Sequence, residues 1–321
     1  MNKNLEEYLI NLRWADRPEI DVPPYEYFCH YTSAESFLNI VQSDGMTLWA
    51  SRIDCMNDAS EWNHAINLYQ STCDYLLKQN NISERFCNAI RDVRPAKEQI
   101  FIHREKAKDD LRSHDIVSSH TEETDRFICC FSKEQDSLPM WNNYARSGGR
   151  IGYNLGLFHG YIDFDKFTLD SGQNRSYSFY KVIYEDSEKY RLMSLQIKGI
   201  GDLVQDEDDV SVAVDAISGL LNEWAITFKR KEFAYENEVR LVVDVPLSEI
   251  KDQLKYRTSN GLIVPYVEVK FPHQCLSSVK IGPLSCLPSD AELQKNIIQE
   301  MLALRGYKGV DISNSEIPIR F

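Results

Sequence analysis

The sequence predicts a mainly antiparallel α+β fold, and three observations support it. Short apolar runs typical of strands outnumber the helices that could connect parallel strands. Neither G-x-G-x-x-G nor G-x-x-x-x-G-K-[ST] occurs, which argues against dinucleotide-binding and P-loop sheets. Helical, highly charged patterns gather in two stretches. We therefore expect one elaborated domain over residues 1–321, with a helical insertion at 58–126 and a second helical stretch at 190–230.

The first strand and the helix after it are expected to place a histidine beside a helix N-terminus. A proline break introduces a strand over Tyr25 to Tyr31. Thr32 and Glu35 form a capping box for the next helix, which Gly45 ends. His30 is therefore expected at the end of a strand, where ligands can meet backbone N–H groups.

Further strands are predicted along the rest of the chain by apolar runs bounded by turn residues. They are MTLWAS, RFICCFS, the run after Gly148-Gly149, Tyr180 to Tyr184, Arg240 to Val245, Pro265 to Lys270 and Val279 to Ile281. An amphipathic helix that contains Ile298 and Leu302 precedes a terminal strand or loop that ends in SEIPIRF.

The composition limits the class of protein. A hydrophobic content of 43% is sufficient for a proper core. We expect a cytoplasmic protein without a membrane partner, because no apolar segment approaches the roughly 20 residues that span a bilayer and no signal-like start occurs. The net charge of -13 disfavours non-specific binding to nucleic acid, which leaves only a local basic patch for such a partner.

No metal site is expected. The 8 cysteines contain no C-x-x-C pair. His103, His114 and His120 fall in a polar segment without the spacing of metal ligands, so solvated helix residues explain them better.

Four short clusters contain the residues that could carry chemistry: CHYT, NDASE, CFSKEQDSLPMWNNYA and YENEVR. Each has a structural explanation when taken alone. His30 could be a hydrogen-bonded core histidine, and NDASE could be only a helix cap. Trp141 and Tyr144, three residues apart, could be a core-facing aromatic pair on one helical turn.

The last cluster lies in FAYENEVRLVV, which reads as a strand. Glu236, Glu238 and Arg240 would share one face of it, because side chains alternate along a strand. A solvated ion-pair ladder, worth about 0 to 1 kcal/mol per pair, explains them without any function. A catalytic face is the alternative.

Taken together and in order, the clusters resemble the bacterial domain of unknown function 2971 family. The resemblance runs from about Tyr25 to the C-terminus. It is carried by HYT, NDxxE, CFS with MWxxYA, ExEVR, the turn Gly282-Pro283, and the ending Ser315, Pro318 and Arg320. The family itself implies no activity.

More remotely, the layout is similar to that of ADP-ribosyltransferases, which implies a split antiparallel sheet and NAD as substrate. By this resemblance Glu238 is the catalytic acid, His30 bonds a ribose hydroxyl, and Tyr144 or Trp141 stacks on nicotinamide. The other NAD-binding residues that it implies are Tyr31, Thr32, Ser132, Glu236 and Arg240. These residue types suit the reaction, since a fixed carboxylate stabilises the oxocarbenium-like state that forms when the nicotinamide bond breaks.

The resemblance therefore implies an NAD-dependent ADP-ribosyltransferase or NAD-cleaving enzyme, similar to bacterial toxins and phage-defence effectors. Its acceptor, a protein or a nucleic acid, is not specified by the sequence, and the oligomeric state stays open. One alternative is a non-catalytic module that binds a nucleotide or a partner. Another is a nucleic-acid enzyme in which Asp58, Glu61, Glu236 and Glu238 hold Mg²⁺.

Overall fold

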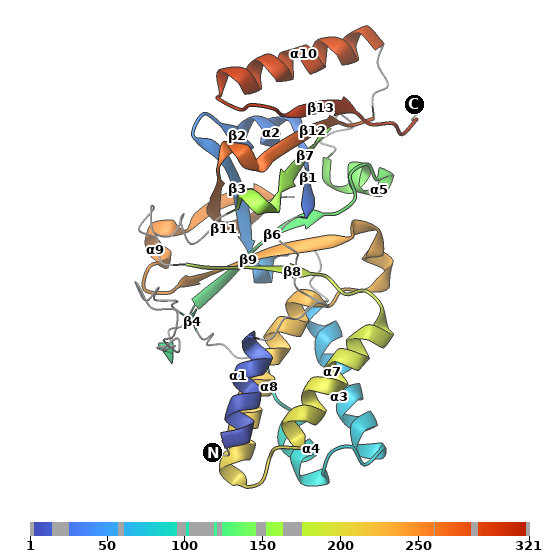
Figure 1. The fold of residues 1–321 in the computed structure, drawn as a ribbon, viewed down its shortest axis with the longest axis vertical. Coiled ribbons are helices and arrows are strands. Elements are labelled where there is room, and N and C mark those ends of the chain that lie inside the picture. Colours follow the sequence, from blue (N-terminus) through green and yellow to red (C-terminus); the bar gives the residue numbers. More distant parts are fainter. Residues whose placement is uncertain are drawn as a thin grey trace. The chain divides into compact units, whose positions relative to one another are not determined.

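The described part of this computed structural model consists of two units (Figure 1). The residues described are 3–14, 26–56, 61–94, 101–102, 119–120, 124–145, 152–162, 175–259, 261–283 and 288–318. A helical unit contains the segments Met1–Asp21, Met56–Thr124 and Lys181–Ala234, and a sheet unit contains Val22–Cys55, Asp125–Tyr180 and Tyr235–Phe321. Several residues named above lie outside the described residues: Asp58, His103, His114, Gly148, Gly149 and Arg320.

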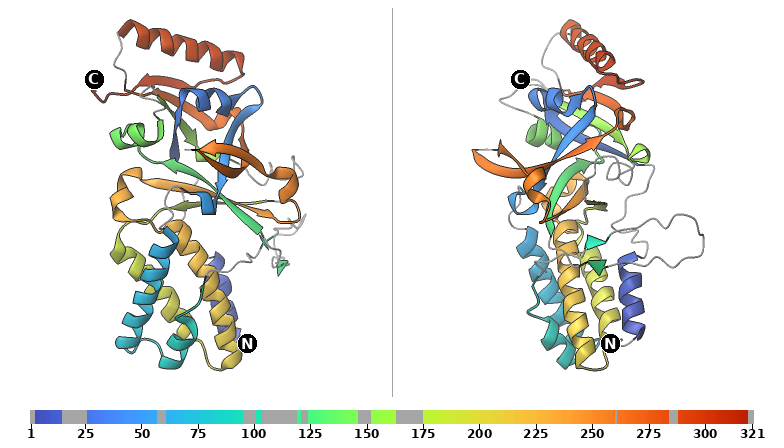
Figure 2. Two further views of the ribbon diagram at one scale, coloured as in Figure 1. Left: turned by 180° about the vertical axis from the view of Figure 1, so that it is seen from behind. Right: turned by 90° about the vertical axis from the view of Figure 1, so that its left-hand side faces the viewer.

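The helical unit is formed by antiparallel and crossing helices that Figure 1 and Figure 2 both draw side by side. They are α1 (Lys3–Trp14), α3 (Glu61–Lys78), α4 (Glu84–Ile90), α7 (Asp186–Gly201) and α8 (Glu207–Thr227). Their apolar faces meet, as where the rings of Tyr69 and Trp224 lie 5.8 Å apart. The Trp224 indole Nε1 donates to Gln196 Oε1 at 2.9 Å, which satisfies a buried polar group between α8 and α7.

The sheet is mainly antiparallel, which confirms the predicted mixed α+β class. Within the described residues it contains 11 strands: β1 (Tyr27–Ser33), β2 (Val41–Gln42), β3 (Gly45–Arg52), β6 (Thr124–Ser132), β7 (Gly152–Phe158), β8 (Ser176–Lys181), β9 (Glu238–Pro246), β10 (Lys255–Ser259), β11 (Leu262–Phe271), β12 (Leu276–Ile281) and β13 (Asp311–Asn314). The order is β10-β11-β3-β6-β1-β7-β12-β13, with β9 paired to β6 and to β8. β12 and β13 run parallel. A separate pair joins β4 (Phe101–Ile102) to β5 (Ser119–His120).

Strand β6 is the branch point of the sheet. Its early part pairs with β3, where Ser51 lies opposite Ile128, and its end pairs with β1, where Cys29 lies opposite Ser132. β9 pairs with β6 as well. Because β1, β6 and β9 carry three of the four sequence clusters, the branch brings those clusters next to one another.

One face of the sheet forms the main core. β9 contributes Val239, Leu241, Val243 and Val245 to it. The helices α2 (Ala34–Ile40) and α10 (Pro288–Leu304) pack on the same core through Phe37, Ile40, Ile298 and Leu302. Each fully buried side chain of this size stabilises the fold by about 1.5 to 3 kcal/mol.

Three predicted element boundaries were wrong. Ser33 rather than Thr32 caps α2, because β1 continues to Ser33; the Ser33 Oγ accepts from the Ser36 N–H at 3.2 Å. Gly45 does not end this helix but begins β3, with φ of +120° and no room for a Cβ, which would lie 2.5 Å from the Phe271 carbonyl oxygen. The late acidic strand begins only at Glu238, because Lys231–Glu236 form a 3-10 turn, η4.

Candidate functional site

One face of β1, β6 and β9 gathers most of the predicted site residues. The side chains of Val239 and Leu241 point into the main core. Their neighbours Glu238 and Arg240 therefore project from the opposite face of β9. That second face also has a small core of its own, formed by Cys29, Tyr31, Met140, Trp141 and Ala145, against which Tyr235 and Ile317 pack. We call it the second core.

Glu238 and Arg240 form a buried ion pair on this face. Arg240 Nε donates to Glu238 Oε1 at 2.9 Å and Arg240 Nη2 donates to Oε2 at 3.1 Å. The exposed fraction is 0% for the Arg240 side chain and 5% for that of Glu238. The pair is therefore not a solvated ladder, and removing either residue would take a two-point ionic contact from a buried charge.

Glu236 lies at the junction of three chain segments. Its carboxylate Oε1 accepts the Tyr144 hydroxyl at 2.6 Å, and its backbone carbonyl accepts the Ser132 hydroxyl at 2.5 Å. The Lys133 N–H donates to the next carbonyl, that of Asn237, at 2.9 Å. The end of β6, the turn that contains Tyr144 and the start of β9 are thus fixed to one another.

Trp141 and Tyr144 do not form a pair that faces the core. They follow the short helix α5 (Leu138–Met140) and lie in a π-helical turn, η2 (Trp141–Ala145). Trp141 is only 1% exposed and meets the Tyr31 ring edge-on, with centroids 4.8 Å apart. Tyr144 is 37% exposed. Of the two residues, Tyr144 is the more exposed, while its hydroxyl is bonded to a buried carboxylate.

His30 and Thr32 belong to the opposite face of β1, because they alternate with Cys29 and Tyr31. The His30 Nδ1 lies 3.1 Å from the Cys130 carbonyl oxygen, and the ring lies 5.9 Å from that of Phe131, a residue of the main core. Burial lowers the pKa of His30, which favours the neutral ring. The structure does not bring His30 to Tyr144 or Glu238.

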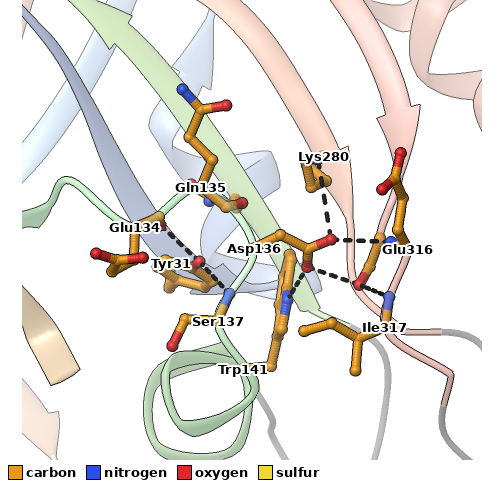
Figure 3. Close-up of polar contacts among 11 residues, drawn as sticks. Tyr31, Glu134, Gln135, Asp136, Ser137, Trp141, Lys280, Glu316 and Ile317 are labelled. Atoms are coloured by element: carbon orange, nitrogen blue, oxygen red, sulfur yellow. Dashed lines mark hydrogen bonds and ion pairs between the residues drawn. The ribbon is translucent and has the colours of Figure 1, made fainter.

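Tyr31 fixes the loop before the π-helical turn. Its hydroxyl donates to the Glu134 carbonyl at 2.7 Å and accepts from the Ser137 N–H at 3.1 Å (Figure 3). Burial raises the pKa of Tyr31 well above its ordinary value, so the phenol stays protonated and keeps its role as donor.

Asp136 is the residue that the sequence analysis missed. Its Oδ1 accepts the Trp141 indole N–H and the Ser315 hydroxyl, both at 2.7 Å, and its Oδ2 accepts the Glu316 N–H at 2.8 Å (Figure 3). Burial raises the pKa of this carboxyl, but the bonds from Ser315, Trp141 and Glu316 outweigh it and hold the pKa below its ordinary value. Lys280 Nζ lies 4.0 Å from Oδ2.

Asp136 and Ser315, which are joined by a hydrogen bond, both lie in motifs noted in the sequence. Asp136 lies within CFSKEQDSLPMWNNYA, and Ser315 begins the C-terminal motif. Nothing in their linear order indicates that they meet. The meeting depends on the sheet order, which sets β13 and the segment after it beside β12.

The described residues contain no group of three or more His, Cys, Asp and Glu side chains arranged to hold a metal ion. Of the proposed magnesium ligands, Glu236 and Glu238 are bonded to Tyr144 and Arg240, and Asp58 is outside the described part of the chain. Among the helices described, none has the length and apolar character needed to cross a membrane.

Fold and site thus define an α+β protein with an antiparallel sheet and a buried acidic cluster at the start of a late strand. Residues 140–241, about a third of the 321-residue chain, match the model of a family described as protein of unknown function (DUF2971). The match includes Tyr144, Glu236, Glu238 and Arg240, and it confirms the resemblance to this family. Comparisons with curated proteins and with solved structures found no match.

Proposed function

We propose that this chain cleaves the nicotinamide bond of NAD, as an ADP-ribosyltransferase or NAD glycohydrolase, with the acids at the start of β9 as its reactive carboxylates. The observation that carries the proposal is the bond between Tyr144 and Glu236. A half-open aromatic ring is fixed at 2.6 Å to a buried carboxylate, two residues before a second buried acid, Glu238. The branch at β6, with an early strand and a late acidic strand as its neighbours, supports a split sheet of the ADP-ribosyltransferase kind.

The reaction accounts for these residue types. Positive charge grows on the ribose as neutral nicotinamide leaves, and a preorganised carboxylate beside the sugar lowers the barrier by several kcal/mol. Glu238 would supply that charge, and Arg240 would hold it in one orientation through its planar, two-point contact. The Tyr144 ring would hold the leaving ring flat.

His30 and Thr32 have no part in this proposal, because their side chains project from the other face of β1. Ser132 acts indirectly, since its hydroxyl holds the Glu236 backbone. The acceptor of ADP-ribose stays open between a protein, a nucleic acid and water. An effector role, as a toxin or in phage defence, follows only from the remote resemblance.

The test is nicotinamide release from NAD by the pure protein. We expect release by the parent chain, and a decrease on the order of 100-fold in kcat for Glu238→Gln, which keeps the shape of the side chain and removes its charge. Glu316→Gln is the matched control, because the Glu316 side chain is exposed and only its backbone N–H contacts the site. Addition of a chelator should change nothing. Absence of release by the parent, or equal release by Glu238→Gln, would refute the proposal.

A second candidate is a non-catalytic module that binds a nucleotide or a partner chain. It is favoured by the Glu238–Arg240 geometry, in which both carboxylate oxygens already accept bonds from the guanidinium. Calorimetric titration with NAD separates the two candidates. Binding by the parent chain without release of nicotinamide, weakened by Tyr144→Ala, supports the binding module.

A further inference from the structure

We infer that Asp136 is a positioning residue that sets the orientation of the Tyr144 ring through the indole of Trp141. The inference deepens the proposed function and, for its kinetic part, rests on it. Asp136 touches neither Tyr144 nor Glu236 in any contact described above. Its influence would pass through the π-helical turn.

The first step is the fixing of Trp141 on two sides. Asp136 Oδ1 accepts its indole N–H at 2.7 Å, and Tyr31 meets its ring edge-on at 4.8 Å. With an exposed fraction of 1%, the indole has no freedom to adopt another rotamer without disturbing the second core. Trp141 is also the first residue of the π-helical turn, so a fixed indole holds one end of that turn in place.

The second step is the fixing of Asp136 itself. The carboxylate accepts bonds from Trp141, Ser315 and Glu316, and the loop around it is held by the Tyr31 hydroxyl through Glu134 and Ser137. A carboxylate with several donors is an oriented acceptor rather than a mobile one. The Trp141 indole therefore binds to a rigid group.

The third step leads to Tyr144. It lies three residues after Trp141 in the same turn, and its hydroxyl reaches Glu236 at 2.6 Å. π-helical turns are rare and are found frequently at functional sites. Loss of the Asp136–Trp141 bond should loosen this turn and change the angle at which the Tyr144 ring faces a ligand.

The experiment is a double-mutant cycle of Asp136→Ala and Trp141→Phe, with the KM for NAD in nicotinamide release as its readout. We expect each single variant to raise KM by about tenfold with a smaller change in kcat, since a misplaced ring weakens positioning of the substrate. The double variant should raise KM no further, because the Asp136–Trp141 bond is lost in either single variant and cannot be lost twice. Asp136→Asn, which keeps one acceptor oxygen, should fall between the parent and Asp136→Ala.

The control is Ser315→Ala, which removes the hydroxyl bond to Asp136 and the bond that this hydroxyl accepts from the Ile317 N–H, while the Glu316 N–H still holds Asp136. It should lower stability and leave KM unchanged. If the effects of Asp136→Ala and Trp141→Phe add, the two residues act separately and the inference is overturned. The same holds if Ser315→Ala raises KM as much as Asp136→Ala, which would indicate a general loss of packing.

A second readout does not depend on the activity. Hydrogen exchange of the backbone amides of Trp141–Ala145 should be faster in Asp136→Ala and in Trp141→Phe than in the parent and in Ser315→Ala. If the parent releases no nicotinamide, the proposed function fails and this exchange alone decides the inference. Unchanged exchange in both variants overturns it. Should Asp136→Ala fail to fold, Trp141→Phe alone gives the same decision.

Discussion

The two ends of β9 carry the same kind of ion pair in different surroundings. At its start, Arg240 binds both carboxylate oxygens of Glu238 within one strand, two residues apart. Near its end, Arg126 of β6 binds both oxygens of Asp244, at 2.6 and 2.9 Å. The first pair is 0% and 5% exposed and the second is 13% and 18% exposed.

The difference in exposure separates an ion pair that stabilises the sheet from one whose contribution to stability is small. The Arg126–Asp244 pair joins two neighbouring strands in partial contact with water, so it stabilises the pairing of β6 with β9. The two residues of the Glu238–Arg240 pair lie on the same strand and are removed from water, where the desolvation cost of the pair offsets most of the attraction. Such a pair adds little stability, which agrees with the proposal that it serves the site.

The largest expected effect is on the buried pair. Arg240→Met should lower the free energy of unfolding by about 3 to 5 kcal/mol, because Glu238 then remains buried without the guanidinium that binds both of its carboxylate oxygens. The double variant Glu238→Met/Arg240→Met should recover most of this loss, since apolar side chains of similar size replace buried ion pairs at little cost. Urea unfolding at neutral pH measures both. If Arg240→Met lowers the free energy of unfolding no more than Asp244→Asn does, the two pairs do not differ as their burial predicts.

The next effect depends on pH and concerns the opposite face. Burial lowers the pKa of His30 below its ordinary value of 6.5, so the unfolded chain binds a proton in acid that the folded chain does not. The free energy of unfolding should therefore fall as the pH decreases below about 6.5, by at most about 1.4 kcal/mol per pH unit, until the folded pKa is reached. Above pH 6.5 this contribution is constant.

His30→Gln tests this linkage, because glutamine can still donate a hydrogen bond and does not titrate. The difference in unfolding free energy between His30→Gln and the parent should grow in favour of the variant as the pH falls from 7 to 5. Two parallel profiles over that range would show that His30 titrates alike in the folded and unfolded chain. Nicotinamide release should keep the parent's rate in His30→Gln, since the proposed site lies on the other face.

How far the sequence predicts this molecule depends on the range of the interaction. The strands around RFICCFS and Pro265 to Lys270 are predicted correctly, because alternation and apolar content are local properties. β10 was missed, since Lys255–Ser259 is a polar edge segment that depends on its partner strand. At the C-terminus the sequence left a strand or a loop open, and the structure has the strand β13.

The candidate site was predictable in its residue types but not in its faces. The sequence grouped His30 with Tyr31 because they are neighbours, whereas alternation along β1 sends their side chains to opposite sides. It also aligned Glu236 with Glu238 on one strand, although Asn237, with φ of +40°, separates the 3-10 turn from β9. Asp136 was missed because two of its partners, Ser315 and Glu316, come from 179 and 180 residues further along the chain, a distance that no local pattern spans.

A smaller effect is expected at the other end of β9. Asp244→Asn should lower the free energy of unfolding by about 1 kcal/mol. The contact of Arg126 with Asp244 is bidentate, which strengthens it, but water partly solvates both charges. The rate of nicotinamide release should stay at the parent value, which makes this variant the matched control for Glu238→Gln. Added salt at 0.5 M should reduce the stability difference at Asp244. A decrease in release as large as that of Glu238→Gln would mean that the whole strand, not its first residues, supports the site.

The smallest effect is expected for an exposed pair in the helical unit. Lys198 and Asp202 lie four residues apart at the end of α7 and are 43% and 53% exposed. Lys198→Ala should change the free energy of unfolding by at most about 0.5 kcal/mol, since water already solvates both charges. Urea unfolding in low and high salt checks this value. If Lys198→Ala lowers the free energy of unfolding as much as Asp244→Asn does, the exposed fraction does not determine how much the three ion pairs contribute to stability. The burial of Glu238 and Arg240 would then not support the proposed site.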